Sequence, residues 1–212
     1  MQHMGAAAID RLQDLGLDVD DIHFAVRLAY TDTLSCTELD APGAIGYLFW
    51  TRTNRYFRER KLTSGWGYSN RYNILKTINP NGDFAITGIS GRGGVGIHNR
   101  NPTCKNPKGT AVSELVQLNE MWQQPALFEI PVETLQPDEM PTWFLLYKTT
   151  DSGINLELSM PVQMHGKNVD TWGERIIIPP LPLDDPGINL GLIDDPTPNV
   201  DPVVDIEFRS AS

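Results

Sequence analysis

The stretch of sequence that decides the fold is residues 143–160, WFLLYKTTDSGINLELSM. Its two apolar runs, 143–149 and 154–160, flank a polar segment, TDSG, whose residue types are typical of a tight turn. Runs of this length that are rich in aromatic and branched side chains and joined by a short turn indicate a β-hairpin. Residues 174–178 add a further strand. Pro179-Pro180 is expected to end that strand, because proline cannot donate a hydrogen bond to a neighbouring strand.

A second hairpin is predicted upstream of the first. Residues 72–78 and 84–89 are strand candidates, and the segment NPNGD between them contains an Asn-Gly pair, a strong short-range hairpin signal. Helices are predicted where apolar residues recur at helical spacing, over residues 6–15, 20–35, 44–62 and 111–122. Helices and hairpins that occur in blocks, without alternating parallel units, favour an α+β fold. We expect a mainly antiparallel sheet of two hairpins plus an extra strand, packed against about four helices.

The C-terminal part of the chain has a different composition. Residues 179–212 contain seven prolines and seven Asp and Glu residues, and such a segment cannot build a core of its own. We therefore expect residues 1–178 to form a single globular α+β domain, followed by an extended, acidic and proline-rich tail over residues 179–212.

Charge is segregated along the chain. The whole chain has a net charge of −10, yet residues 52–108 carry eleven Lys and Arg against two Asp and Glu. The remaining segments, 1–51, 109–178 and 179–212, are all acidic. A local excess of one sign attracts ligands of the other sign, so an anionic ligand is expected to meet residues 52–108.

The composition also bears on the cellular compartment. Two cysteines are too few for a disulfide framework, and the first residues lack the pattern of a signal peptide. The apolar runs are too short to span a bilayer. We therefore expect a soluble cytoplasmic protein that does not bind membranes.

The basic segment interleaves cations with aromatic rings, a pattern typical of surfaces that neutralise phosphates and stack on unpaired bases. On a helical wheel of residues 44–62, the aromatic side chains share one arc, whereas Arg52, Arg55 and Arg58 lie in another. Trp66 and Tyr68, both adjacent to glycine, are the candidate stacking residues. An alternative interpretation stays open, in which the aromatic side chains form the core and the arginines pair with acidic parts of the same fold.

A glycine-rich loop follows the strand that is predicted over residues 84–89. Residues 88–109 contain six glycines and two prolines without usable periodicity, which is typical of functional or disordered loops. The segment GRGGVG, residues 91–96, has the G-x-G-x-x-G spacing of dinucleotide-binding loops. No helix is predicted directly after it, although that motif requires one, so we reject the dinucleotide interpretation.

The start of the last predicted helix is a candidate phosphate site. Lys105 and Lys108 lie just ahead of Thr110, the predicted N-cap. Unpaired N–H groups and the helix dipole favour an anion at such a position. Arg92 and Arg100 of the loop are expected to contribute to the same phosphate-binding surface. The alternative is a capped helix start beneath a mobile loop.

Catalytic signatures are weak. His98 and Cys104 lie six residues apart in the loop, but no third group that would orient them is identifiable. Four carboxylates lie near predicted strand or helix ends and are candidates for a metal-dependent nuclease, although their spacing selects no pair: Asp83, Glu114, Glu157 and Glu174. The two cysteines and four histidines lack paired metal-ligand spacing. We therefore assign no catalytic residue, no metal site and no cofactor.

These features predict a cytoplasmic binding protein, prokaryotic or viral, that engages phosphate-bearing ligands and most readily nucleic acid. Two alternatives remain open: a metal-dependent hydrolase or nuclease acting on the same ligands, and an acidic interaction protein that imitates nucleic acid and binds a basic protein partner. The acidic tail is itself a predicted partner of the basic surface, in the same chain or a neighbouring one, where it would restrain ligand binding. The tail residues expected to make this contact are Asp184, Asp185, Asp194 and Asp195.

Overall fold

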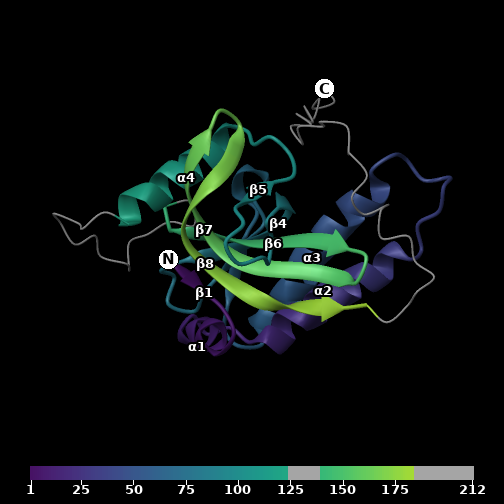
Figure 1. The fold of residues 1–212 in the computed structure, drawn as a ribbon, viewed down its shortest axis with the longest axis horizontal. Coiled ribbons are helices and arrows are strands. Elements are labelled where there is room, and N and C mark those ends of the chain that lie inside the picture. The colour runs from purple at the N-terminus through teal and green to yellow at the C-terminus, as the bar shows by residue number, and fades with distance from the viewer. Residues whose placement is uncertain (124–138, 184–212) are drawn as a thin grey trace, which may run out of the picture.

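One large β-sheet forms the centre of the fold (Figure 1). The computed structural model describes residues 1–123 and 139–183. Within them the sheet has eight strands in the order β1-β8-β7-β6-β4-β3-β2, and β5 pairs with the end of β4. The strands are β1 (Gln2–His3), β2 (Gly67–Ser69), β3 (Lys76–Ile78), β4 (Ala85–Gly93), β5 (Pro102–Cys104), β6 (Thr142–Thr150), β7 (Gly153–His165) and β8 (Asn168–Pro182).

The sheet is mixed rather than purely antiparallel. β1 pairs in parallel with β8, and β4 pairs in parallel with β6, whereas the other pairs are antiparallel. The hairpin predicted over residues 143–160 is confirmed as β6 and β7, in which Thr150 pairs with Gly153 and Phe144 pairs with Ser159. Gly153 has a φ of 148°, and a Cβ there would overlap the carbonyl group of Leu181 on β8, so this turn requires glycine.

Helices cover both faces of the sheet, and the predicted helix ranges are confirmed. They are α1 (Ala6–Asp14), α2 (Val19–Thr33), α3 (Ala44–Leu62) and α4 (Thr110–Gln123). Figure 1 shows α2 and α3 side by side, with α4 apart from them. Successive side chains of a strand point to opposite faces, so Trp143 and Leu145 of β6 pack with residues of α1, α2 and α3, while Phe144 packs with residues of β5 and α4. The α+β fold class is therefore confirmed.

Two buried asparagines fasten helices to the sheet. On α3, Asn54 Nδ2 donates to Gly88 O (3.1 Å), and Gly88 N donates to Asn54 Oδ1 (2.8 Å). On α4, the Asn119 amide makes the same two-way exchange with Thr142 and also donates to Pro161 O. Each amide occupies the place of a peptide group in a neighbouring strand, and it satisfies backbone groups that would otherwise be buried without partners.

The strand predicted over residues 72–78 is shorter than expected, because only Lys76–Ile78 are extended. A 3-10 helix, η1 (Arg71–Asn73), precedes it. Tyr72 and Asn73 have φ values of 54° and 56°. Two successive residues in the left-handed region cannot continue a strand, so the chain bends here before β3 begins.

The prediction that Pro179-Pro180 ends the last strand is wrong, since β8 continues to Pro182. Among the described residues, β1 covers the outer edge of β8 only at Arg175 and Ile176. Beyond that point a proline of β8 that faces outward loses no hydrogen bond to another strand. A bulge between the pairs of Ile154 and Leu156 accommodates the extra residue of β8. The acidic tail residues Asp184, Asp185, Asp194 and Asp195 lie outside the described residues, so their contact with the basic surface stays a prediction.

Candidate functional site

The arginines of α3 mostly pair with acidic residues of the same fold, as the alternative interpretation of the basic segment expects. Three of the four arginines on this helix contact carboxylates: Arg52 with Asp32 (2.9 Å), Arg55 with Glu59 (2.7 Å) and Arg60 with Asp21 (2.6 Å). The hydrogen bonds from Arg60 and Lys61 outweigh burial, which acts in the opposite direction, and hold the pKa of Asp21 below its ordinary value. Much of the positive charge on this helix is therefore balanced within the fold.

Arg58 is the exception on α3. Its guanidinium donates three hydrogen bonds, to Asn70 Oδ1 (2.8 Å), Ser69 O (2.8 Å) and Lys76 O (3.1 Å). All three acceptors are neutral, and no carboxylate of the described residues forms an ion pair with it. Burial lowers the pKa of Arg58 from its ordinary value, but a guanidinium stays charged at neutral pH. Arg58 thus places a fixed, unneutralised positive charge at the β2 edge of the sheet.

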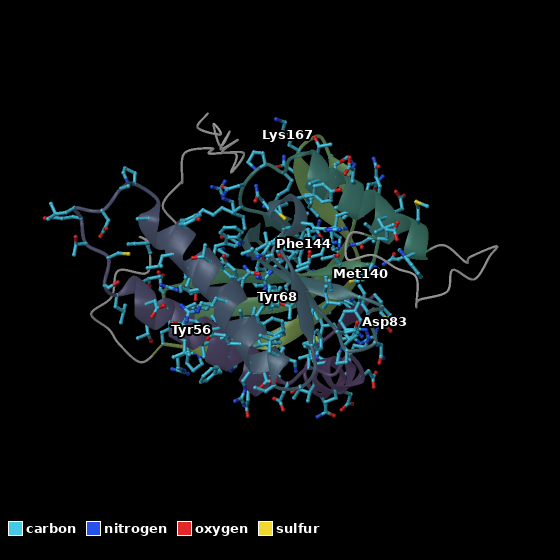
Figure 2. The ribbon with its side chains drawn as sticks, turned by 180° about the vertical axis from the view of Figure 1, so that it is seen from behind. Tyr56, Tyr68, Asp83, Met140, Phe144 and Lys167 are labelled. Atoms are coloured by element: carbon cyan, nitrogen blue, oxygen red, sulfur yellow. The ribbon has the colours of Figure 1, made fainter. Side chains whose placement is uncertain are left out.

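Two exposed tyrosines, Tyr68 and Tyr72, follow Arg58 along the chain, and the first of them contacts its guanidinium. The Arg58 guanidinium carbon lies over the ring of Tyr68 at 5.3 Å from its centre, and Tyr68 remains 58% exposed on the edge strand β2. Tyr72 in η1 is 67% exposed. Figure 2 labels Tyr68, together with Tyr56 of α3, on the side of the molecule that faces away in Figure 1. We call Arg55, Arg58, Tyr68 and Tyr72 the edge patch.

Trp66, the other predicted stacking residue, is not available to a ligand. It is only 4% exposed and belongs to the core beneath α1, α2 and α3. Its ring packs edge-on against Phe84, and Lys61 Nζ lies 5.1 Å from the ring centre. Gly65 has a φ of 82°, so it reverses the chain after α3 and turns the indole inward. The flanking glycines therefore indicate a turn and not exposure, and the stacking assignment of Trp66 is wrong.

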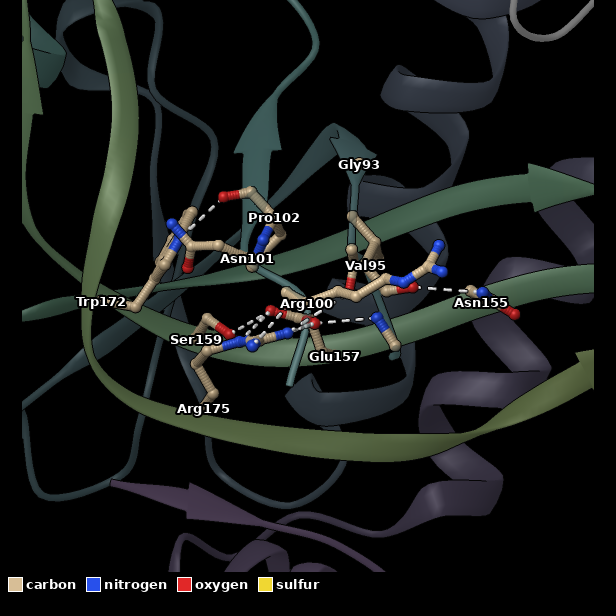
Figure 3. A network of polar contacts seen from close by, with 12 residues as sticks. Gly93, Val95, Arg100, Asn101, Pro102, Asn155, Glu157, Ser159, Trp172 and Arg175 are labelled. Atoms are coloured by element: carbon tan, nitrogen blue, oxygen red, sulfur yellow. Dashed lines mark hydrogen bonds and ion pairs between the residues drawn. The ribbon is translucent and has the colours of Figure 1, made fainter. Parts of the chain in front are cut away.

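The glycine-rich loop packs on a buried ion pair between Glu157 and Arg175 (Figure 3). Gly94 O and Arg100 O both accept hydrogen bonds from the guanidinium of Arg175, at 3.3 and 2.9 Å. Gly96 N donates to the carboxylate of Glu157 at 2.8 Å. A Cβ on Gly94 would overlap the backbone of Arg100. The G-x-G-x-x-G spacing therefore reflects close backbone packing on a charged pair.

Two predicted phosphate ligands, Arg92 and Arg100, are exposed on this loop and the strand before it. In Figure 3 the Arg100 side chain extends toward Asn155, which pairs with Lys148 across β6 and β7. Lys148 Nζ donates to Gly93 O at 3.4 Å. Lys148, which we did not predict, thus adds a cation beside the loop. Arg92 and Arg100 form no ion pair within the described residues.

The predicted phosphate site at the start of α4 is only partly exposed. Lys105 is buried, and Lys108 N donates to Lys167 O at 2.8 Å. Gly109 O accepts the first helical hydrogen bond from Ser113 N, so Gly109 occupies the N-cap position and Thr110 is the first helical residue. The predicted capping role of Thr110 is therefore wrong by one position. A phosphate at this helix start stays a prediction.

The candidate catalytic groups form neither a reactive thiolate nor a metal-binding cluster among the described residues. Burial raises the pKa of the Cys104 thiol to about 11, which disfavours the reactive thiolate. The four predicted carboxylates are separate: Asp83 accepts from Asn79, Glu157 pairs with Arg175, Glu174 pairs with Arg11, and Glu114 is exposed on α4. Within residues 1–123 and 139–183, no three His, Cys, Asp or Glu side chains gather to hold a metal ion.

Two hollows lie where α2 meets α3, at the opposite end of α3 from Arg58. One of about 380 Å³ is lined by Thr31, Asp32, Ser35, Leu48 and Arg52. The other, of about 290 Å³, is lined by residues 37, 38 and 40–45. Leu39 projects from the intervening turn and is 91% exposed. The turn at this end therefore presents an exposed leucine between Glu38 and Asp40, in contrast to the edge patch.

None of the helices in the described residues has the length and apolar character to cross a bilayer. Searches among protein families, characterised proteins and solved structures found no match to this chain.

Proposed function

We propose that the protein binds phosphate-bearing ligands, and nucleic acid in preference to a free nucleotide, at the edge patch. The observation that carries the proposal is Arg58, whose hydrogen-bond partners among the described residues are all neutral and which lies beside an exposed tyrosine ring. A phosphate is the natural counter-ion for such a guanidinium. Neither of the two hollows includes an edge-patch residue, so the patch suits a polymer lying on the surface better than an enclosed small molecule.

Electrostatics favour binding at this one part of the molecule. The acidic segments of the chain repel a polyanion, so the basic segment determines the orientation of approach. Arg55, one helical turn from Arg58, forms an ion pair with the exposed Glu59. Exposed pairs of this kind contribute little to stability, so Arg55 can exchange Glu59 for a phosphate at small cost.

A salt titration tests this proposal. Fluorescence anisotropy of a labelled single-stranded thymidine oligomer of about 15 nucleotides should show binding that weakens as salt rises. Arg55→Gln should lower the slope of log affinity against log salt by about 0.7, the contribution of one phosphate contact on a single strand. Arg27→Gln, which removes an exposed arginine of α2, is the matched control and should leave the slope unchanged. Absence of binding, or an equal effect of both variants, would contradict the proposal.

The cytoplasm is the proposed compartment. Cys36 and Cys104 are both free thiols, which suits a reducing environment.

A second candidate function is supported by the turn between α2 and α3. The exposed Leu39 lies between Glu38 and Asp40, and within the described residues neither carboxylate forms an ion pair. An apolar side chain between two negative charges complements a basic partner surface that offers an apolar contact. We propose a basic protein segment as the occupant.

A synthetic peptide of alternating lysine and leucine is the probe for this second candidate. Leu39→Ser should weaken its binding, and the exposed Leu62→Ser at the other end of α3 should not. Equal binding to both variants, or self-association of the protein through Leu39 in its place, would overturn this assignment.

A further inference from the structure

We infer that the outer face of the Tyr68 ring is a stacking platform for an unpaired base, so that the ligand of the edge patch is a single strand and not a duplex. This inference rests on the proposed function and specifies its ligand. Three features of the structure support it: the support beneath the ring, the place of the ring in the sheet, and a second fixed aromatic residue nearby in the chain.

The first feature is the support of the ring. Arg58 lies against one face of Tyr68 at 5.3 Å. Its guanidinium cannot swing away without breaking hydrogen bonds to Asn70, Ser69 and Lys76. The ring is therefore held from one side by a fixed planar cation, while Tyr68 as a residue remains 58% exposed to solvent. A ring that is already ordered loses little conformational entropy when a base stacks on it.

The second feature is the position of Tyr68 at the end of the sheet. Tyr68 pairs with Thr77 of β3, and within the described residues no strand lies beyond β2. Since Thr77 pairs in turn with the core residue Ile86, Tyr68 lies on the face of the sheet that α3 covers. Its side chain therefore stands at the junction of helix and sheet edge, where a strand of nucleic acid can approach without displacing a secondary-structure element.

The third feature is Tyr72. Its backbone is in the left-handed region, with φ 54° and ψ 30°, a conformation that costs a non-glycine residue on the order of 1 kcal/mol or more. The bond from Ile74 N to Arg71 O (3.1 Å) closes the turn around it. A large aromatic side chain held in this conformation and 67% exposed gains nothing for the core. It is instead available to a second base.

These features select an unpaired base because stacking requires access to the base face. In a duplex the faces are covered by neighbouring base pairs, except at the ends, so Tyr68 and Tyr72 have nothing to stack on. In a single strand every base has an open face, and the phosphates remain available to Arg55 and Arg58.

The test compares a single-stranded thymidine oligomer with a blunt hairpin duplex of equal phosphate number, both by fluorescence anisotropy at one salt concentration. The single strand should bind more tightly than the duplex. Tyr68→Ala should weaken single-strand binding by about 5- to 150-fold, the range for loss of one stacked base, and should leave duplex binding unchanged. Tyr68→Phe keeps the ring and should bind like the parent protein. Tyr47→Ala removes an exposed tyrosine at the other end of α3 and is the matched control.

Photocrosslinking gives a direct readout. A single strand in which 5-iodouracil replaces thymine should crosslink to Tyr68, as located by mass spectrometry of the digested protein. Equal affinity of strand and duplex, or parent-like binding by Tyr68→Ala with no crosslink at Tyr68, overturns the stacking inference while phosphate binding by Arg55 stands. Failure of both probes to bind overturns the inference and the proposed function together.

Discussion

The carboxylate of Glu157 and the guanidinium of Arg175 face each other across β7 and β8, with Arg175 Nη2 at 2.6 Å from Oε2 and Arg175 Nε at 3.1 Å from Oε1. Glu157 is completely buried, and Ser159 Oγ and Gly96 N supply its remaining hydrogen bonds. The pair therefore has the partners that a buried charge needs, and the glycine-rich loop supplies part of them.

Removal of one charge from this pair should be costly. Glu157→Gln leaves Arg175 as a buried cation without a counter-charge, so we expect a loss of about 3–5 kcal/mol in the free energy of unfolding. Urea denaturation measures it. Glu59→Gln breaks an exposed pair with Arg55 and should cost less than about 1 kcal/mol. Similar losses in the two variants would show that burial does not set the strength of the Glu157 pair.

The glycine-rich loop should tolerate no side chain at Gly94. In Gly94→Ala the new methyl group overlaps the backbone of Arg100, which must move and weaken its bond to Arg175, so we expect a loss of about 3 kcal/mol. Gly166→Ala is the comparison, because its φ of 61° is strained but nothing lies near the added methyl group. It should cost about 1–2 kcal/mol. Thermal melting of both variants checks the order, and a more stable Gly94→Ala would contradict the packing.

Glu174 should make stability depend on pH. Burial acts to raise its pKa, but the hydrogen bonds and charge of Arg11 and the charge of His3 outweigh burial, so the pKa lies below its ordinary value. A carboxyl group with a lowered pKa contributes stability above its unfolded pKa, near 4.5, and loses that contribution as pH falls toward its folded pKa.

Glu174→Gln should therefore be less stable than the parent protein at pH 7, by about 1–2 kcal/mol, and the difference should shrink steadily as pH falls below about 4.5. Urea denaturation at a series of pH values measures it. A difference that grows toward acid pH would reverse the sign of the effect and contradict the pairing with Arg11.

Each asparagine bridge should contribute measurably to stability. Asn54→Ala leaves Gly88 N buried without its acceptor, so we expect a loss of about 1–3 kcal/mol. Asn119→Ala does the same to Thr142 N and should cost a similar amount. Gln117→Ala, at an exposed position of α4, is the control and should change stability by less than about 0.5 kcal/mol. Hydrogen exchange of the Gly88 amide should accelerate in Asn54→Ala alone.

Local sequence patterns predicted the elements whose contacts are local. The hairpin of β6 and β7 follows from two apolar runs around one turn, and the bounds of α3 follow from the turn before Ala44 and from its apolar arc. The parallel pairing of β4 with β6 has no local signal, since the chain between them passes through β5 and α4. The pairing of distant strands depends on which faces of the helices and strands pack together. Local patterns in a single sequence do not reveal this packing.

The sequence predicted which types of residue form the candidate site, but not which individual arginines and tyrosines belong to it. Alternation of arginines and aromatic side chains identified the basic segment, yet Arg52, Arg58 and Arg60 look alike along the helix. Their different environments come from Asp32 and Asp21 of α2 and from Asn70 beyond β2, positions fixed only by tertiary packing. Tyr72 belongs to the aromatic residues of the basic segment, but its left-handed backbone had no signal in the sequence, because the turn around it sets that conformation.

The hydrogen bonds between Asn54 and Gly88 also determine where Arg58 lies on the surface of the molecule. Asn54 and Arg58 are four residues apart, so they lie about one helical turn from each other along α3. The Asn54 amide makes two hydrogen bonds with Gly88, so a shift of the helix along β4 or a rotation about its own axis would break them. The buried Asn54 amide thereby fixes the position of Arg58 relative to Tyr68. A substitution of Asn54, which no ligand can touch, would therefore misalign the solvent-exposed contact between Arg58 and Tyr68.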